Sequence, residues 1–419
     1  MMLRLGIDIG TSGVRTAVLD GDEVVSTATT EHPKQLGQAI DANLWWDAVE
    51  ECLKSQMNAL RDTGGDPRLI AGVAVDGTSG SMVLTDSDLN PVSPALMYNS
   101  KGFTEEAVEI ARHADDAHIT KGSNSALARA MRLVKEATEK PCHLLHQADF
   151  IAAKLMGQGG HSDFNNALKT GFDPETNAWP EWIAHIIEPS LLPRVHAPGR
   201  AIAHVSTSVA ETYGLSPDMM VHAGTTDSIA AFLASAPIRE SVAVSSLGST
   251  LAIKMLSSTR IDDPSIGLYS HRLGEFWLVG GASNTGGAVL KSFFSTSELV
   301  ELSTQIDPSK PCDLSYYPLL QPGERFPIND PDLAPLLTPR PVEDAAFLYG
   351  LLDGIAGIEA QCYEAINARG GGMPSRIFTA GGGSQNEVWT AIRARHIGVP
   401  IETAEYTDAA IGAAKLIVQ

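Results

Sequence analysis

Short apolar runs bounded by glycine turns dominate the pattern of this chain. In residues 5–20, LGIDIGTSGVRTAVLD, two apolar runs are separated by Gly10, Thr11, Ser12 and Gly13. We expect two strands joined by a tight turn there, because apolar runs flanked by Gly and Ser are typical of strands. The stretch AVLDGDEVVSTATT adds an Asp-Gly turn and another strand, which predicts a three-stranded meander at the N-terminus.

The same pattern of strand, turn and strand returns three times. LIAGVAVDGTSGSMVLTD places Asp76 at the end of an apolar strand, just before a second Gly-Thr-Ser-Gly. HAGTTDSIAAFLAS, residues 222–235, has a Gly-Thr-Thr turn followed by Asp227 and an apolar helical run. VAVSSLGSTLAIKML, residues 242–256, has a Gly-Ser-Thr turn between two strands, and EFWLVGG after it completes a second predicted meander.

Helical spacing of apolar residues predicts the longer helices. Residues 42–61 and 343–367 each carry one broad apolar face, and residues 104–156 are expected to be mainly helical. Residues 157–200 are rich in Gly, Pro and Asn and predict irregular connections with a short Trp-bearing helix. Residues 311–341 hold eight prolines and predict an extended surface excursion. RIFTAGGGSQNEVWTAIRARHIGVPIETA then predicts a strand, a glycine turn, a helix and a strand, and DAAIGAAKLIV predicts a closing helix.

These elements form two similar α/β halves, and we expect a cleft between them. A chain of 419 residues also exceeds the length at which one hydrophobic core keeps growing, so two domains are the default. The boundary is expected near residues 230–240, where a helix gives way to the second meander.

The turns suggest a site for a metal-bound phosphate. Successive backbone N–H groups in a tight turn make an anion-binding nest, and Asp8 beside that anion would be repelled unless a metal ion lay between them. The chain has no G-x-x-x-x-G-K-[ST] loop and no G-x-G-x-x-G that opens a helix after a strand. A phosphate site must therefore be formed by the Gly-Thr/Ser turns. Phosphoryl transfer needs donors around the phosphates, an acid for Mg²⁺ and an acid near the acceptor hydroxyl.

Net charge and hydrophobicity limit the classes of binding partner that the sequence favours. The formal net charge of −20 repels nucleic acid and anionic membranes, so binding to either is not expected. The N-terminus starts directly with a strand, and no apolar run reaches the 18 residues needed to span a bilayer, which favours a cytoplasmic protein. Either a monomer or a homodimer is consistent with the sequence.

Four widely spaced cysteines indicate a reduced compartment and buried thiols. Cys142, His143 and His146 are the only local cluster of metal-binding residue types. On a helix Cys142 and His146 would face the same side, but ordinary helix packing is favoured over a metal site because no further ligand lies nearby in the sequence.

The motifs resemble those of a known family. DIGTSGVRTAVLD resembles the first phosphate motif of the actin, hexokinase and Hsp70 superfamily. VHAGTTDSIAAFLAS with SSLGST resembles the second phosphate region of its FGGY carbohydrate kinases. IFTAGGGSQNEVW resembles their adenosine motif, SDFNNALKTGFDPETNAW a middle segment, and DAAIGAAKLIV their closing helix. The similarity covers essentially the whole chain in the right order, and it is greatest to the compact D-ribulose-kinase-like subgroup, often labelled xylulose-kinase-like.

The resemblance implies an α/β fold of two ribonuclease H-like (actin-like ATPase) domains with a cleft between them. Residues 1–234 plus 408–419 would be the sugar-binding domain with the returning C-terminal helix, and residues 235–407 the nucleotide-binding domain. The implied activity is phosphorylation of a small-molecule sugar with ATP and Mg²⁺. D-ribulose, phosphorylated at O5, is the preferred acceptor, and xylulose or a related polyol is the alternative.

The resemblance also implies roles for single residues. Asp227 matches the catalytic base that takes the proton from the sugar hydroxyl, and Asp8 matches the acid that organises Mg²⁺, through water. Asp8, Ser12 and Asp227 would thus also border the sugar. The turn around the transferring phosphate corresponds to Thr11, Ser12 and Gly13, and the opposite wall to Gly248, Ser249 and Thr250. Close approach of the nucleotide corresponds to Gly382 and Gly383, and the positions beside adenine and ribose to Asn386 and Trp389. The floor of the sugar pocket corresponds to Asp76, Thr78 and Ser79.

Structural alternatives stand beside these roles. Asp227 could be only an N-cap for the helix that follows, Asp76 could simply end a strand, and Trp389 could be a core residue. An ATPase of the same superfamily without a sugar acceptor is the alternative from another functional class.

Two family segments are absent. KQLGQAIDANLWWD stands in place of a Trp-x-Glu-Gln segment, and PALMYNSKG in place of an Asp-x-Arg. Both segments lie near the sugar in larger members of the family, and their absence favours a smaller pocket for an open-chain ketopentose.

Overall fold

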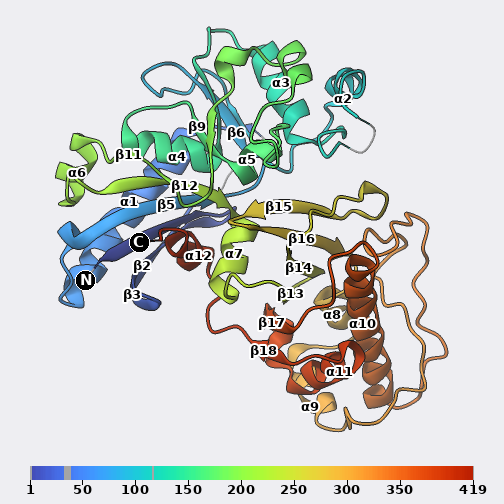
Figure 1. The fold of residues 1–419 in the computed structure, drawn as a ribbon. Coiled ribbons are helices and arrows are strands. Elements are labelled where there is room, and N and C mark those ends of the chain that lie inside the picture. Colours follow the sequence, from blue (N-terminus) through green and yellow to red (C-terminus); the bar gives the residue numbers. More distant parts are fainter. Residues whose placement is uncertain (1, 33–38, 116–117, 419) are drawn as a thin grey trace. The chain divides into compact units, whose positions relative to one another are not determined.

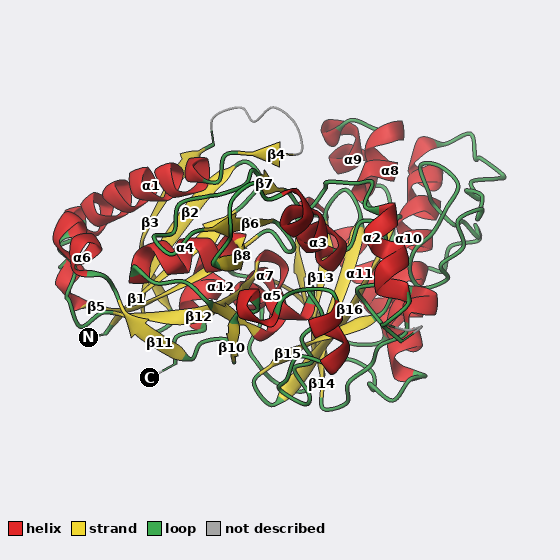
Figure 2. Ribbon diagram, turned by 90° about the horizontal axis from the view of Figure 1, so that it is seen from above, coloured by secondary structure: helices red, strands yellow, loops and turns green. Residues whose placement is uncertain are grey.

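The computed structural model describes residues 2–32, 39–115 and 118–418 and divides the chain into two compact units. The first unit comprises Met1–Ala234 and Asp408–Gln419, and the second unit comprises Ser235–Thr407. Each unit has a six-stranded sheet and its own hydrophobic core (Figure 1; Figure 2).

The large sheet of the first unit begins with the meander that the sequence predicts. Its strand order is β11–β12–β5–β1–β2–β3, in which β1, β2 and β3 are antiparallel neighbours, while β5 is parallel to both β1 and β12. The strands are β1 (Leu3–Ile9), β2 (Gly13–Asp20), β3 (Glu23–Glu31), β5 (Ile70–Gly77), β11 (Ala201–His204) and β12 (Met220–Thr226).

Alternation along β1 decides which helix each side chain meets. Leu5 and Ile7 lie in the core that also contains the buried face of helix α1 (Asn43–Asp62). Gly6, between them, faces helix α12 (Ala409–Lys415), and a Cβ on Gly6 would lie 1.8 Å from the carbonyl oxygen of Ala410. Because side chains alternate along a strand, Asp8 has its side chain on the same face as Gly6. The closing helix therefore covers the face of the sheet that carries Asp8.

The remaining elements of the first unit surround this sheet. Helix α4 (Gln147–Met156) packs on β5 and β12 and also contacts α1. A second, smaller core lies between β6 (Met82–Thr85), α2 (Thr104–Ala111) and α3 (Ala126–Glu136). The helices are α2 (Thr104–Ala111), α3 (Ala126–Glu136), α4 (Gln147–Met156), α5 (Phe164–Leu168), α6 (Thr207–Tyr213) and α7 (Asp227–Ser235), with the 3-10 turns η1 (Pro67–Leu69), η2 (Glu181–His185) and η3 (Pro189–Leu191). Two small sheets contain β4 (Ala39–Ile40), β6 (Met82–Thr85), β7 (Ala95–Leu96) and β8 (His143–His146), and β9 (His161–Asp163) and β10 (Arg194–His196).

One helical prediction is wrong. The segment from His143 to His146 is strand β8, paired with β6, and it precedes α4. Cys142 is exposed and His146 is buried, so the two side chains do not share a helical face. Among the described residues no group of three His, Cys, Asp or Glu side chains could hold a metal ion, so this cluster forms no such site.

The second unit repeats the plan of the first. Its sheet has the order β15–β16–β14–β13–β17–β18, with antiparallel β13, β14 and β16 followed by parallel β17 and β18. The strands are β13 (Val242–Leu247), β14 (Leu251–Ser257), β15 (Tyr269–Leu273), β16 (Phe276–Ser283), β17 (Arg376–Ala380) and β18 (Ile401–Thr403). The helices are α8 (Gly287–Phe293), α9 (Thr296–Ser303), α10 (Asp344–Asn367) and α11 (Glu387–Ile397), with the 3-10 turns η4 (Pro264–Ile266) and η5 (Gly382–Gln385).

The proline-rich residues 311–341 contain no helix or extended strand, as predicted, but they are not only a surface excursion. Phe326 is fully buried, and Tyr316 is nearly so, in the core of the second unit. Glu324 is also buried and accepts hydrogen bonds from the Ser283 hydroxyl, at 2.6 Å, and from the Asn284 N–H, at 2.7 Å. The segment therefore packs against the end of β16.

No helix among the described residues combines the length and the apolar character that crossing a membrane requires.

Candidate active site

Three aspartates meet at the carboxyl edge of the sheet in the first unit. Asp8 on β1 is directly opposite Asp76 on the parallel strand β5, and Asp76 is opposite Thr225 on β12. Asp227 follows β12 at once, as the first residue of α7. Since the carboxyl ends of parallel strands share one edge of a sheet, residues far apart in the sequence form one acidic cluster.

Asp8 has a cationic neighbour on its own hairpin. Arg15 lies opposite Asp8 across the β1–β2 pair, and its Nη1 donates to Asp8 Oδ2 at 3.1 Å. Asp8 is buried, whereas the Arg15 side chain is 43% exposed. Burial raises the pKa of Asp8, and the neighbouring carboxyl of Asp76 and the Arg15 charge act in the opposite direction. Asp8 could be selected from the sequence because it is an acid inside an apolar run. No such pattern marked Arg15.

Asp76 is fully buried, and no cation from the described ranges binds it. Within the described residues neither of its oxygens receives an N–H or O–H donor, and its polar contact is the carboxyl of Asp8. Burial first, and then the charge of Asp8, raise the pKa of Asp76 well above 3.8. Two buried carboxyls in contact cannot both be charged cheaply, so burial and the charge of Asp8 favour the protonated form of Asp76.

This proton predicts an unusual pH dependence of stability. Because folding raises the pKa of Asp76 above 3.8, the associated stability is present at acidic pH and is lost as the pH rises through the raised pKa. A fully retained proton corresponds to about 1.4 kcal/mol per pH unit, or roughly 3–6 °C in the midpoint of a domain of this size. We expect Asp76→Asn to flatten the fall of the midpoint between pH 5 and 8, measured by thermal unfolding at fixed ionic strength.

Asp86→Asn is the matched control for that slope, because hydrogen bonds from Asn90 hold the pKa of Asp86 below its usual range. Its titration is complete below pH 5, so it should leave the slope unchanged. Equal slopes for wild type and Asp76→Asn would contradict a proton on Asp76.

Asp227 occupies the junction of strand and helix. The predicted Gly-Thr-Thr turn before it is not a turn: Thr225 and Thr226 belong to β12 and pair with β5. Asp227 Oδ1 accepts the N–H of Ser228 at 2.6 Å, and its side chain is half-buried. Its charge also contributes to the raised pKa of Asp76, which places the two carboxyls near each other.

The first glycine turn has tight backbone closure. The Gly10 N–H donates to the Gly13 carbonyl at 2.9 Å, and Thr11 and Ser12 are exposed. A Cβ on Gly13 would lie 2.2 Å from the Thr30 carbonyl oxygen, so pairing with β3 already requires glycine there. His32, which the sequence analysis did not select, covers the turn: its N–H donates to the Ser12 carbonyl at 3.0 Å, and its Nε2 lies 3.2 Å from the Gly10 oxygen.

Neutral polar groups follow the aspartates. Thr78 donates to Gln147 Oε1 through its N–H, at 2.9 Å, and through its hydroxyl, at 2.6 Å. Asn165 on α5 donates through Nδ2 to the Thr225 hydroxyl at 3.0 Å. Ser79 is only partly buried. Gln147 and Asn165 were not predicted; Asn165 lies within the family segment SDFNNALKTGF, which was a signal, whereas Gln147 had none.

Several buried polar atoms near this edge lack a partner among the described residues. They include Gln147 Nε2, His146 Nδ1, Asn165 Oδ1 and Thr226 Oγ1. Unpartnered buried polar atoms are costly and are usually satisfied by water or a ligand. The concentration of such atoms here is what a binding site for a hydroxyl-rich molecule requires.

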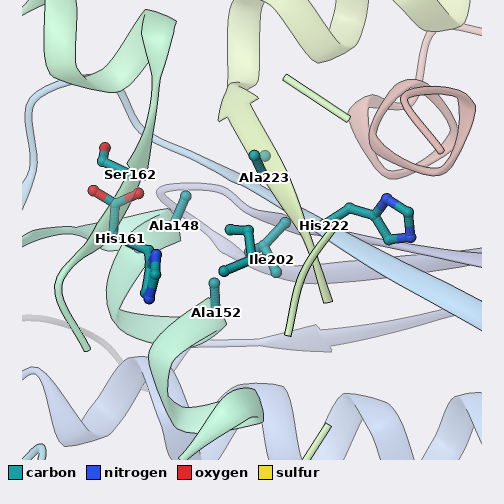
Figure 3. Close-up of a pocket in the computed structure, with 10 residues that line it drawn as sticks. Ala148, Ala152, His161, Ser162, Ile202, His222 and Ala223 are labelled. Atoms are coloured by element: carbon teal, nitrogen blue, oxygen red, sulfur yellow. The ribbon is translucent and has the colours of Figure 1, made fainter. Parts of the chain in front are cut away.

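A separate small cavity lies behind β12. Figure 3 shows residues that line it, among them Ala148 and Ala152 of α4, Ser162 of β9 and Ile202 of β11. Its volume is about 10 Å³. This is at the lower limit for one water molecule, so the cavity cannot hold a sugar.

In the second unit, the predicted Gly248–Ser249–Thr250 turn joins β13 to β14 and is exposed. The N–H groups of Gly287 and Ala288, at the start of α8, donate to the carbonyls of Gly248 and Ser249 at 2.9 and 3.1 Å. Gly286 has φ +145°, and a Cβ there would lie 2.7 Å from Thr250 Cα. The first residues of α8, which were not predicted from the sequence, therefore hold this turn in place.

The glycine turn after β17, which includes η5, contains the residues that were predicted to lie beside the nucleotide. A Cβ on Gly382 would meet nothing within 4 Å, whereas one on Gly383 would lie 2.6 Å from the ring of Trp389. Trp389 is 1% exposed and belongs to the core, where its ring lies against Gly383. Asn386 Oδ1 accepts the Trp389 N–H at 3.0 Å and caps α11. Contacts of these residues with a nucleotide stay predictions.

A family model described as "FGGY family of carbohydrate kinases, N-terminal domain" matches residues 3–234, and the model of the C-terminal domain matches residues 243–418. Xylulose kinase from Staphylococcus xylosus is 26% identical over 98% of this chain and 89% of that protein. Xylulose kinase from Streptomyces coelicolor is 27% identical over 98% of this chain and 86% of that protein.

Solved structures are similar over the full fold. The structure of xylulose kinase from Rhodospirillum rubrum has a TM-score of 0.84 at 22% identity and covers 99% of this chain and 89% of its own. Plasmodium falciparum glycerol kinase with ADP has a TM-score of 0.86 at 15% identity, with coverage of 99% and 89%. These similarities confirm the predicted α/β fold of two actin-like ATPase domains.

Proposed function

This chain belongs to the FGGY family of carbohydrate kinases and is an ATP-dependent sugar kinase, and we propose that its acceptor is a ketopentose phosphorylated at a terminal hydroxyl. The observation that carries the proposal is the meeting of Asp8, Asp76 and Asp227 at one sheet edge, beside neutral hydroxyl and amide groups. Neutral donors and acceptors suit the hydroxyls of an uncharged sugar, and a carboxylate can accept the proton of the attacking hydroxyl.

Within this proposal the aspartates have different roles. Asp227 is the general base, because it is half-buried at the open edge, beyond the strand. Asp76, which retains a proton, stays neutral and can donate a hydrogen bond. Asp8 is oriented by Arg15, and the N–H groups of Ser12 and Gly13 lie in the turn that would receive the transferring phosphoryl group. Thr78 and Ser79 line the sugar side of the same edge.

The residues fit Mg²⁺ only in a hydrated form. Within the described residues no three acidic, His or Cys side chains are arranged around one metal position, so the chain does not enclose the ion by itself. Mg²⁺ keeps several waters and binds nucleotide phosphates, which agrees with a single carboxylate, Asp8, facing its water shell. When bound, Mg²⁺ neutralises charge on the phosphates.

We propose that ATP binds the second unit. The exposed turn Gly248–Thr250 has free space for phosphate oxygens, and Gly382 has open space above its backbone. The similar glycerol kinase structure was solved with ADP, which supports nucleotide binding by this fold.

The two candidate acceptors are D-xylulose and D-ribulose, which differ only in configuration at C3. The names of the relatives favour D-xylulose. The resemblance to the compact subgroup and the two absent family segments favour D-ribulose. One hydrogen bond made to the correct C3 hydroxyl and lost with the epimer would give a preference of about tenfold.

The proposal is tested by ADP release from purified protein with ATP and Mg²⁺, and with D-ribulose, D-xylulose, glycerol, gluconate or no acceptor. We expect one ketopentose to raise kcat/KM by about tenfold or more over its epimer and over the other acceptors. Release that is equal in every tube would identify an ATPase without a sugar acceptor and would overturn the proposal. Release that is highest with glycerol or gluconate would overturn the acceptor class alone.

A further inference from the structure

Arg129 is a buried cation whose hydrogen-bond acceptors, within the described residues, are all backbone carbonyls. It lies on α3, is 1% exposed, and its Nε has no partner among the described residues. Its Nη1 donates to the Gly80 carbonyl at 2.6 Å. Its Nη2 is close to three more carbonyls, those of Tyr98 at 2.8 Å, Ser100 at 3.3 Å and Asn124 at 3.3 Å.

No carboxylate in the part of the chain that the structure describes binds Arg129, which makes this arrangement unusual. Burial lowers the pKa of Arg129 to about 10, which leaves the guanidinium charged at neutral pH. Arg132, on the same helix, shows the ordinary alternative: it is bound by both oxygens of Glu106, at 2.6 and 2.9 Å. Both guanidinium groups also lie over the ring of Phe103, at 5.7 and 5.5 Å. The two arginines therefore differ in their acceptors and in burial, since the Arg132 side chain is 25% exposed.

The carbonyls belong to three loops that lie far apart in the sequence. The first loop follows β5 and contains Gly80, whose φ of +86° turns the chain toward the guanidinium. The second contains Tyr98 and Ser100, within PALMYNSKG, and the third precedes α3. A planar guanidinium has five donors in a fixed fork, so one side chain can fix the relative positions of these loops.

Hydrogen bonds connect these loops to the floor of the proposed sugar pocket. Ser81, next to Gly80, accepts the Tyr98 N–H at 3.0 Å, and its hydroxyl lies 2.6 Å from the Thr78 hydroxyl. Thr78 in turn donates to Gln147. The path from Arg129 to Thr78 therefore passes through two short contacts.

We propose that Arg129 is a positioning residue for sugar binding: it joins the loop of Gly80 and Ser81 to the loop of Tyr98 and Ser100 and thereby holds Thr78 and its neighbours in place. The proposal rests on the proposed function for the location of the sugar. It assigns to α3, which contributes no predicted site residue, the role of setting the affinity for the sugar and leaves the affinity for ATP to other elements.

Steady-state kinetics test the proposal with a matched pair of variants. Arg129→Met should raise KM for the sugar by about tenfold or more, because hydrogen bonds from a charged donor are lost, and should leave KM for ATP within about twofold. Arg132→Met removes an arginine from the same helix and the same aromatic ring and should change neither constant beyond about twofold.

Guanidinium chloride at millimolar concentration should restore part of the sugar affinity of Arg129→Ala and should not affect Arg132→Ala. If Arg129→Met does not fold, Arg129→Lys replaces it, since lysine keeps the charge but lacks the planar fork.

Hydrogen exchange supplies a readout that does not depend on the acceptor. In Arg129→Met we expect amides in residues 78–81 and 97–100 to exchange about tenfold faster or more, while amides of residues 235–407 keep their rates. Faster exchange in those loops with a wild type that shows no sugar-dependent turnover would retain the positioning role and discard the proposed function. Unchanged loop exchange in the variants, or equal rises in KM for sugar and ATP, would overturn the role of Arg129.

Discussion

Replacement of Asp227 by asparagine should lower sugar-dependent ADP release by a factor of about 10² to 10⁴, the usual contribution of a general base. Asparagine keeps the oxygen that can accept the Ser228 N–H, at 2.6 Å in the wild type, but it cannot accept a proton from the sugar. The substitution therefore separates the two interpretations of this residue. A catalytic base predicts a large loss of kcat with little change in the midpoint of thermal unfolding.

Two further variants complete the test: Asp227→Ala, and Asp66→Asn as a control at another helix cap. Asp227→Ala removes both the base and the local hydrogen bond, so it should lower kcat as far as asparagine does and should also lower the unfolding midpoint. Asp66 caps η1 by accepting the Arg68 N–H at 2.9 Å, and Asp66→Asn should leave turnover unchanged. Near-normal turnover of Asp227→Asn, with reduced stability only in the alanine variant, would show that Asp227 is a helix cap.

The local pattern of the sequence was sufficient for the N-terminal meander and for the longest helix. Alternating and continuous apolar runs predicted the meander of β1, β2 and β3, and the structure confirms the antiparallel pairs. The glycine turns at Gly10–Gly13 and Gly248–Thr250 were also predictable, because a strand that reverses within four residues needs them. The helix predicted over residues 343–367 is α10, Asp344–Asn367, since its apolar spacing extends over several turns.

Short segments were less predictable because tertiary pairing overrides local preference. The residues His143–His146 have no strong preference for a strand, yet pairing with β6 makes them β8. Thr225 and Thr226 follow a glycine and were predicted to be a turn, but β5 extends far enough to pair with both. In each case the deciding partner lies at least 50 residues away in the sequence.

The polar partners of the site were hidden for the same reason. Asp8 and Asp76 could be selected as acids at the ends of apolar strands, but the contact between them depends on a parallel pair formed across 68 residues. Gln147 reaches Thr78 across 69 residues, and Arg129 reaches Gly80 across 49. Sequence patterns identify residues that interrupt an apolar run, whereas they do not reveal which polar side chains from other elements satisfy them.

The same kind of long-range pairing predicts the largest effect on stability, in the core of the second unit. Arg393 on α11 and Glu359 on α10 are both fully buried and are joined by two hydrogen bonds, at 2.5 and 2.8 Å. Arg393 also donates to the Thr379 hydroxyl at 2.9 Å, and the Ser245 hydroxyl donates to Glu359 at 2.5 Å. Thr379 lies on β17 and Ser245 on β13, so the pair connects both helices to the strands that end at the glycine turns.

Removal of one partner leaves an unpaired charge in a dry core. We expect Arg393→Met to lower the free energy of unfolding by about 3–5 kcal/mol. For a domain of about 170 residues this corresponds to a fall of roughly 6–20 °C in the unfolding midpoint. Differential scanning calorimetry of the whole chain, with chemical denaturation as a second measurement, would record the change.

A double variant and a surface pair decide whether the loss comes from the unpaired charge. Arg393→Met combined with Glu359→Leu should recover much of the stability, because apolar side chains of similar volume can replace a buried ion pair at little cost. Arg376 and Glu402 form a comparable pair at 3.2 Å between β17 and β18, but their side chains are 55% and 48% exposed. Arg376→Met should therefore cost less than about 1 kcal/mol. A double variant no more stable than Arg393→Met would indicate that the guanidinium stabilises this core through its bond to Thr379 and its packing, and not through its charge.

Since Ser245 and Thr379 lie on the strands that lead into the two glycine turns, a destabilised core should also raise KM for ATP, while KM for the sugar stays near its wild-type value.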